Sequence, residues 1–101
     1  MVYVILSSWP LDKNKEVVQI AMELPPVPEY ISRKMLVKGE LGVGSKCFDI
    51  YEFDNSKYEE AREYLNSRVA AFYSVPGFTY EIEHWYDEQE AMEFMMKYMS
   101  K

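Results

Sequence analysis

Residues 56–86, SKYEEAREYLNSRVAAFYSVPGFTYEIEHWY, decide the predicted fold because a helix, a turn and a strand follow one another directly. Ser56-x-x-Glu59 is a capping box that predicts the start of the helix. Its apolar residues recur at helical spacing and form one stripe: Tyr58, Ala61, Leu65, Val69 and Phe72. Residues 75–77, Val-Pro-Gly, end the helix in a turn. Residues 78–86 then alternate between two sets of side chains, as a strand with two different faces does.

The residues on both sides of this segment predict further elements of the same two kinds. A β-branched and aromatic run at 2–9 is stopped by Pro10, and the pair Pro25-Pro26 ends a charged helix that begins at Asp12. Asp87-x-x-Glu90 caps a last helix that runs almost to Lys101. Two strands, at 33–41 and 46–54, are connected through Gly39, Gly42 and Gly44.

The predicted order is strand, helix, strand, strand, helix, strand, helix. It matches the split βαβ, or ferredoxin-like, α+β arrangement, in which the helices cover one face of a four-stranded antiparallel sheet. The 101 residues suit a single domain, 1–101, yet 49% of them are hydrophobic and 16% aromatic. One small core does not bury so many apolar side chains. We therefore expect a second sheet, from a partner chain, over the uncovered face.

In this layout the chain resembles the dimeric α/β-barrel superfamily, in which two ferredoxin-like subunits pack sheet to sheet. More narrowly, residues 73–86 (YSVPGFTYEIEHWY), followed by Glu90-Ala91, resemble small uncharacterised members of that superfamily. So does the Trp9-Pro10 opening before a charged helix. The resemblance implies a dimeric barrel and no single activity, because the wider superfamily includes cofactor-independent monooxygenases, isomerase-like enzymes, haem-binding proteins and ligand-sensing domains.

Charge and cysteine content exclude several classes of function. Eleven Lys and Arg against 17 Asp and Glu give a net charge of −6, without the basic stripe that nucleic-acid binding requires. Cys47 has no partner for an internal disulfide, and one His with one Cys is too few for a zinc site. No signal segment and no membrane span is recognised. We expect an acidic cytoplasmic protein with no metal, no cofactor, no nucleic-acid partner and no membrane partner.

Strand alternation predicts which side chains line the barrel interior. On apolar character, Phe78, Tyr80 and Ile82 are assigned to the helix side of the last strand, and Phe48 and Ile50 to the helix side of the third. The residues then expected to face a ligand are Tyr3, Asp49, Tyr51, Glu81, Glu83 and Trp85, with His84 as a further candidate on the helix-facing side or at the rim. Ile5 and Ser7 are expected on the same interior face as Tyr3.

Glu81 and Glu83 lie on one side of their strand, with Cα atoms about 7 Å apart. In a cavity of low dielectric, such a pair is one way to make a general acid or base. Two other interpretations remain open. The carboxylates can face water on an edge strand, or they can form salt bridges with Arg33 or Lys38 of a partner chain.

The last helix is apolar on more than one side, which is typical of a helix buried on several sides. One stripe, Ala91, Phe94, Met95 and Tyr98, is expected in the core of the same subunit. The other side, Met92, Met96 and Met99, is expected to form an oligomer contact, with a pliable ligand wall or ordinary exposure to solvent as the alternatives.

These features predict a homo-oligomer, a dimer or a multiple of dimers, that binds a small organic molecule between sheet and helices. The alternative is a cofactor-independent enzyme of the monooxygenase or isomerase type, in which Tyr51, Glu81 or His84 orients or deprotonates an aromatic or carbonyl substrate. Haem binding through His84 is a third possibility, suggested by the haem-binding members of the superfamily.

Overall fold

The computed structural model describes residues 1–40 and 44–99, and Gly42 of the predicted glycine-rich connection lies outside them. The predicted order of strands and helices is confirmed. The elements are β1 Val2–Trp9, the 3-10 turn η1 Leu11–Lys13, α1 Asn14–Glu23, β2 Ile31–Glu40, β3 Gly44–Phe53, the 3-10 turn η2 Asn55–Lys57, α2 Tyr58–Ala70, β4 Thr79–Trp85 and α3 Glu88–Met99.

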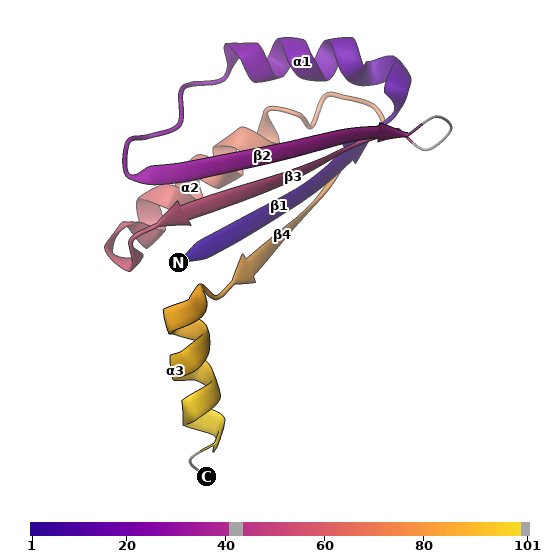
Figure 1. Ribbon diagram of the computed structural model, residues 1–101. Coiled ribbons are helices and arrows are strands. Elements are labelled where there is room, and N and C mark those ends of the chain that lie inside the picture. Colours follow the sequence, from indigo (N-terminus) through magenta and orange to yellow (C-terminus); the bar gives the residue numbers. More distant parts are fainter. Residues whose placement is uncertain (41–43, 100–101) are drawn as a thin grey trace.

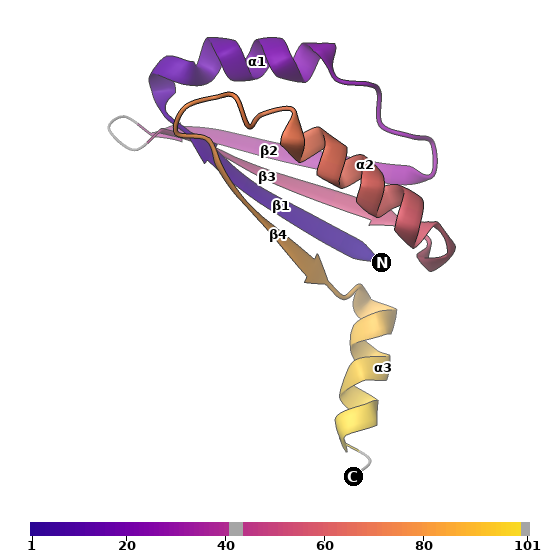
Figure 2. The same ribbon diagram turned by 180° about the vertical axis from the view of Figure 1, so that it is seen from behind.

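The four strands form one antiparallel sheet in the order β2-β3-β1-β4. Both α1 and α2 lie on the same side of this sheet, as Figure 2 shows, whereas in Figure 1 the strands are seen with no helix in front of them. The protein is therefore an α+β domain with a four-stranded antiparallel sheet and three helices, compatible with the ferredoxin-like fold.

The core lies between the sheet and α2. The predicted apolar stripe of α2 is confirmed, because Ala61, Leu65 and Val69 are buried against the sheet. The sheet residues of this cluster are Ile5, Ile31, Tyr51 and Phe53. A second cluster places Val17 of α1 against Phe72 and Val75, which follow α2.

The two predicted capping boxes have different outcomes. At α3 the box is present, since the Glu90 amide donates to the Asp87 carboxylate over 2.8 Å and the Asp87 amide donates to the Glu90 carboxylate. At α2 the prediction is wrong. The Asp54 carboxylate accepts from the Ser56 amide over 2.9 Å, and a 3-10 turn precedes the α-helix. An acidic residue two positions earlier has taken the capping role from Ser56.

The faces assigned to β1 and β3 are a second correction. Tyr3 and Ile5 pair with Tyr51 and Asp49, and this set faces the helices, so Phe48 and Ile50 lie on the opposite side of the sheet. Apolar character misled the prediction because both faces of β3 are largely apolar, and because Arg33 neutralises the charge of Asp49 on the helix side. In β4 the prediction is confirmed, with Phe78 and Ile82 on the helix side.

Helix α3 leaves the end of β4 and points away from the sheet (Figures 1 and 2). None of its described residues is buried. The stripe expected in the subunit core is therefore not there, and Phe94, Met95 and Tyr98 are exposed. Phe94 contacts only its aromatic neighbours Tyr86 and Tyr98 among the described ring pairs. The helix that was expected to complete the core has no sheet beneath it.

Candidate functional site

The helix side of the sheet holds a buried polar cluster centred on Asp49. The Arg33 guanidinium donates to one Asp49 oxygen from Nε over 3.0 Å and from Nη2 over 2.9 Å. The Cys47 thiol lies 3.6 Å from the other oxygen. Although burial opposes its charged form, the neighbouring Tyr51 and Asp49 hold the pKa of Arg33 above its ordinary value. The pair gives the carboxylate the partner that a nearly buried charge requires.

Tyr51 stands beside this pair and is fully buried, with 0% of its surface exposed. Within residues 1–40 and 44–99 its hydroxyl has no partner of hydrogen-bond geometry. Burial, reinforced by the charge of Asp49 and opposed by Arg68 and Arg33, raises the pKa of Tyr51 to about 12. At neutral pH Tyr51 is therefore a phenol that can donate a hydrogen bond and cannot serve as a base.

A cavity of about 30 Å3 adjoins Asp49, Tyr51 and Arg68 between the sheet and α2. A polar space of this size holds about one water molecule, which would give the Tyr51 hydroxyl a partner. Pockets for small organic ligands measure several hundred cubic ångströms. This cavity is therefore too small for the ligand that the sequence led us to expect between the sheet and the helices. A second hollow on the same side of the sheet, lined by Tyr3, Ile82 and residues of α2, measures about 290 Å3, which is at the lower end of that range.

Cys47 provides a pH-dependent test of this cluster. Burial, with the nearby charge of Asp49, raises the pKa of the Cys47 thiol to about 11. Between the ordinary thiol pKa of about 9 and this value, the folded state keeps a proton that the unfolded chain has lost, so stability falls as pH rises. We expect the free energy of unfolding in urea to fall between pH 8 and 10.5 by about 1–2 kcal/mol more in the parent than in Cys47→Ala. Equal losses in both proteins would contradict the assigned burial.

The opposite side of the sheet, here called the open face, carries the side chains that alternate with the core set. Strand pairing arranges them in four rows across β2, β3, β1 and β4: Lys38, Lys46, Ser8 and Thr79; Leu36, Phe48, Leu6 and Glu81; Lys34, Ile50, Val4 and Glu83; Ser32, Glu52, Val2 and Trp85. The centre of the open face is therefore apolar and its two edges are charged.

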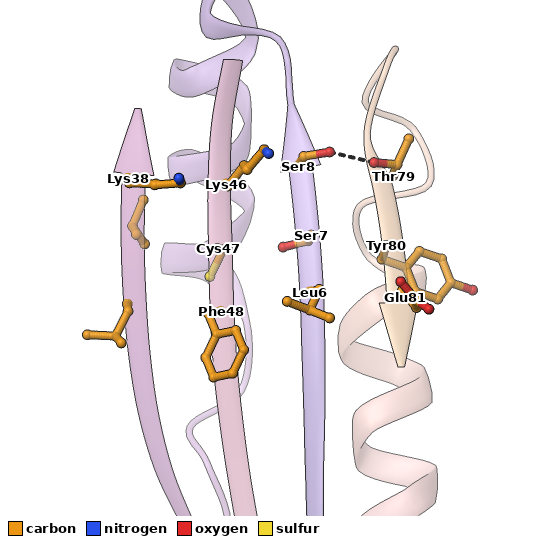
Figure 3. Close-up of a pocket in the computed structure, with 12 residues that line it drawn as sticks. Leu6, Ser7, Ser8, Lys38, Lys46, Cys47, Phe48, Thr79, Tyr80 and Glu81 are labelled. Carbon is orange, nitrogen blue, oxygen red and sulfur yellow. Dashed lines mark hydrogen bonds between the residues drawn. The ribbon is translucent and has the colours of Figure 1, made fainter. Parts of the chain in front are cut away.

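A hollow of about 660 Å3 lies over the first two of these rows. Figure 3 shows Lys38 and Lys46 at one end of it, level with Ser8 and Thr79, whose hydroxyl groups are 2.6 Å apart. Leu6 and Phe48 lie in the next row of the same view. An apolar floor with a cationic group at one end suits a small molecule that has an apolar body and an anionic group.

The seven predicted ligand-binding residues are divided between the two faces of the sheet. Tyr3, Asp49, Tyr51 and His84 lie on the helix side. Tyr3 is between Tyr51 and His84 in the strand pairing, and its ring centroid is 5.1 Å from that of His84, with the two rings tilted by 33°. Burial, with the hydroxyl of Tyr58, raises the pKa of Tyr3 to about 12. Glu81, Glu83 and Trp85 lie on the open face, where the Trp85 indole donates to Glu83 over 2.9 Å.

On each face of the sheet, the main contacts are made by residues that were not among the predicted ligand-binding residues. Arg33 holds Asp49 on the helix side, while Leu6, Leu36, Phe48 and Lys46 form the hollow of the open face. The alternation of side chains along each strand predicts which residues lie on the open face, provided that the side of the sheet on which Asp49 lies is known. The pairing of Arg33 with Asp49, 16 residues apart, has no local signal.

The predicted oligomer contacts Met92, Met96 and Met99 are exposed on α3, and their role stays a prediction. In the part of the chain that the structure describes, no three His, Cys, Asp or Glu side chains are grouped as metal ligands. None of the described helices has both the length and the apolar character needed to cross a membrane.

No family model matches this sequence, and neither the curated proteins nor the solved structures that were compared with it contain a match.

Proposed function

We propose that the protein is a homodimer that packs sheet to sheet and binds a small organic molecule in the hollow of the open face. The observation that carries this proposal is the open face itself. Its centre is apolar, and no described helix lies over it (Figure 1). Of its apolar side chains, Leu36 and Trp85 are exposed, Leu6, Phe48 and Ile50 are partly exposed, and Val2 and Val4 are buried. An exposed apolar patch marks an interaction site. A second copy of the chain offers an identical sheet face, and two such faces stack about 10 Å apart in known folds.

The position of helix α3 favours contact with a second copy of the chain over burial of its apolar side chains within the same subunit. It is the one helix of the described chain that is not packed on the sheet, and it points away from the domain. Met92, Met96 and Met99 are 55%, 63% and 78% exposed. In the proposed assembly these flexible apolar side chains contact the other subunit, which buries them without a rearrangement of the parent fold.

The ligand is assigned to the open face because of size and charge. The hollow of about 660 Å3 lies well within the usual range for small-molecule sites, whereas beneath α2 the cavity beside Tyr51 measures about 30 Å3 and the hollow beside Tyr3 about 290 Å3. Between two packed sheets, the short side chains of Ser8 and Thr79 leave this end of the interface unfilled. Lys46 is positioned to attract an anionic group, and Leu6 and Phe48 to contact an apolar body. The proposed class is a small aromatic or aliphatic carboxylate.

The geometry favours binding over catalysis. The three residues considered for an enzyme do not meet, because Glu81 lies on the open face while Tyr51 and His84 lie on the helix side. Tyr51 is sealed from solvent and keeps its proton at neutral pH. Glu81 therefore cannot act on the same bound molecule as Tyr51 or His84, and Tyr3 lies between Tyr51 and His84 in the sheet.

Titration with 2-naphthoate, followed by amide NMR spectra, tests the proposed ligand site. We expect the largest shift changes at the amides of Leu6, Ser8, Phe48 and Thr79, because their side chains surround the hollow. Lys46→Glu should weaken binding about 10-fold or more, since it replaces attraction of the carboxylate by repulsion.

Lys15→Glu is the matched control. It makes the same change of charge on the exposed surface of α1, so naphthoate affinity should stay within about twofold of the parent. Shift changes grouped around Tyr51 or on α3 instead of the hollow would contradict the assigned site, and so would equal effects of the two variants.

A further inference from the structure

The hollow of the open face has groups of opposite charge on its two sides. Lys46, on β3, lies at one end of the hollow, in the same row as Ser8 and Thr79. Glu81, on β4, also lines the hollow, one row further along. Figure 3 shows Glu81 across Ser8 and Leu6 from Lys46. The hollow therefore holds a cationic group and an anionic group at two separate places.

Neither of these charges is neutralised within the described part of the chain. Among residues 1–40 and 44–99, Lys46 and Glu81 form no ion pair, and both side chains are exposed. Strand β1 separates the two strands that carry them, which places those strands about 10 Å apart. A ligand with a carboxylate alone is attracted by Lys46 and repelled by Glu81. A ligand that also carries a positive group can pair with both residues at once.

The hydroxyl groups of Ser8 and Thr79 add a neutral donor at the cationic end of the hollow. They are 2.6 Å apart, so one of them donates its proton to the other. The second hydroxyl proton is not used in this bond and can be donated to a ligand. Together with the ammonium group of Lys46, this hydroxyl pair offers a donor to each of the two oxygens of one carboxylate.

The floor of the hollow beside Glu81 is apolar. The same row contains Leu6 on β1, Phe48 on β3 and Leu36 on β2, and each of them is at least partly exposed. An apolar group of the ligand that extends toward β2 would lie on this row, on the side away from Glu81. The hollow thus has three different parts: a donor end, an acidic side and an apolar floor.

We propose that the ligand of the open face is an apolar amino acid, with its carboxylate at Lys46 and the hydroxyl pair and its ammonium group at Glu81. Its side chain lies on the apolar row. This inference rests on the proposed ligand site and narrows the ligand class from a carboxylate to a zwitterion. The three groups of an amino acid leave one tetrahedral carbon in three directions, as the three parts of the hollow require. The mirror-image molecule makes only two of the three contacts, so the site distinguishes the enantiomers.

Calorimetric titration with phenylalanine and with 3-phenylpropanoate tests this role of Glu81, because the two molecules differ only in the ammonium group. We expect the parent to bind one enantiomer of phenylalanine about 10-fold more tightly than 3-phenylpropanoate, and the other enantiomer about fivefold or more weaker than the first. Glu81→Gln should remove most of this preference and leave the affinity for 3-phenylpropanoate equal or higher, since a repulsion is lost. Both ligands are measured on the same variant, so a loss of folded protein cannot change their ratio.

Glu83→Gln is the matched control. Glu83 lies on the same strand and face, one row beyond Glu81 and outside the hollow, so the ratio of the two affinities should stay within about twofold of the parent. If 3-phenylpropanoate binds in the hollow but neither enantiomer of phenylalanine binds more tightly, the amino acid is wrong while the proposed carboxylate site stands. The same conclusion follows if Glu81→Gln leaves the ratio unchanged or if the enantiomers bind equally. If phenylalanine, 3-phenylpropanoate and 2-naphthoate all fail to bind, both proposals are overturned.

Discussion

Replacement of Arg33 by leucine is expected to cost about 3–5 kcal/mol of unfolding free energy, because it leaves the Asp49 carboxylate buried without a counter-charge. The Arg33 guanidinium makes two contacts of about 3 Å with one Asp49 oxygen, and the Asp49 side chain is only 10% exposed. The weak Cys47 thiol is the remaining donor to the carboxylate among the described contacts. Urea unfolding monitored by circular dichroism measures the loss.

Two further variants separate this effect from a simple loss of side-chain packing. Lys15→Leu removes an exposed positive charge from α1, away from the open face, and should alter stability by less than about 0.5 kcal/mol. The double variant Arg33→Leu/Asp49→Leu removes both charges, so it should recover most of the loss. A double variant as unstable as Arg33→Leu alone would show that the ion pair is not the cause.

Replacement of Leu36 by aspartate is expected to turn the proposed dimer into a monomer at micromolar concentration. Leu36 is 56% exposed on the open face of edge strand β2, so the folded subunit should tolerate the change. In the proposed interface the new carboxylate loses its contact with water and has no positive charge to compensate it within its own subunit. We expect a loss of about 3 kcal/mol or more in association free energy, roughly a 100-fold or larger rise in the dissociation constant.

Val18→Asp is the matched control for Leu36→Asp. Val18 is 55% exposed and lies on α1, away from the open face. It introduces the same charge at an equally exposed apolar position, and the variant should sediment as the parent does. If both variants are monomers, association depends on exposed apolar side chains in general and not on the open face. If only Val18→Asp is a monomer, the interface lies on the helix side of the sheet.

Local patterns in the sequence predicted most of the fold. The helical stripe through Ala61, Leu65 and Val69 is buried as its spacing indicates, and the alternation of β4 places Phe78 and Ile82 on the correct side. These signals work because a helix or strand repeats every few residues and one of its faces must leave water. The order of the elements then restricts the sheet to few topologies.

The facing of β3 could not be predicted in the same way, because it depends on a contact between strands. Asp49 is tolerated on the buried side only through Arg33, which enters from β2. Without that partner, the rule that charges avoid the core assigns Asp49 and Tyr51 to the open face. Asp49 and Tyr51 are instead buried on the helix side, and Leu6, Leu36, Phe48 and Lys46 line the hollow of the open face.

The position of α3 shows a second limit of sequence patterns. Phe94, Met95 and Tyr98 have the spacing of a core stripe, yet they are exposed in the single chain. An apolar stripe in the sequence indicates that one side of a helix is buried. It does not indicate whether the same chain or another molecule buries that side.

The mass of the protein in solution tests the central claim most directly. We expect sedimentation equilibrium at micromolar concentration and physiological salt to give 24.0 kDa, twice the 12.0 kDa of one chain, or a higher even multiple. A mass of 12.0 kDa under these conditions would contradict the claim that a second copy covers the open face of the sheet.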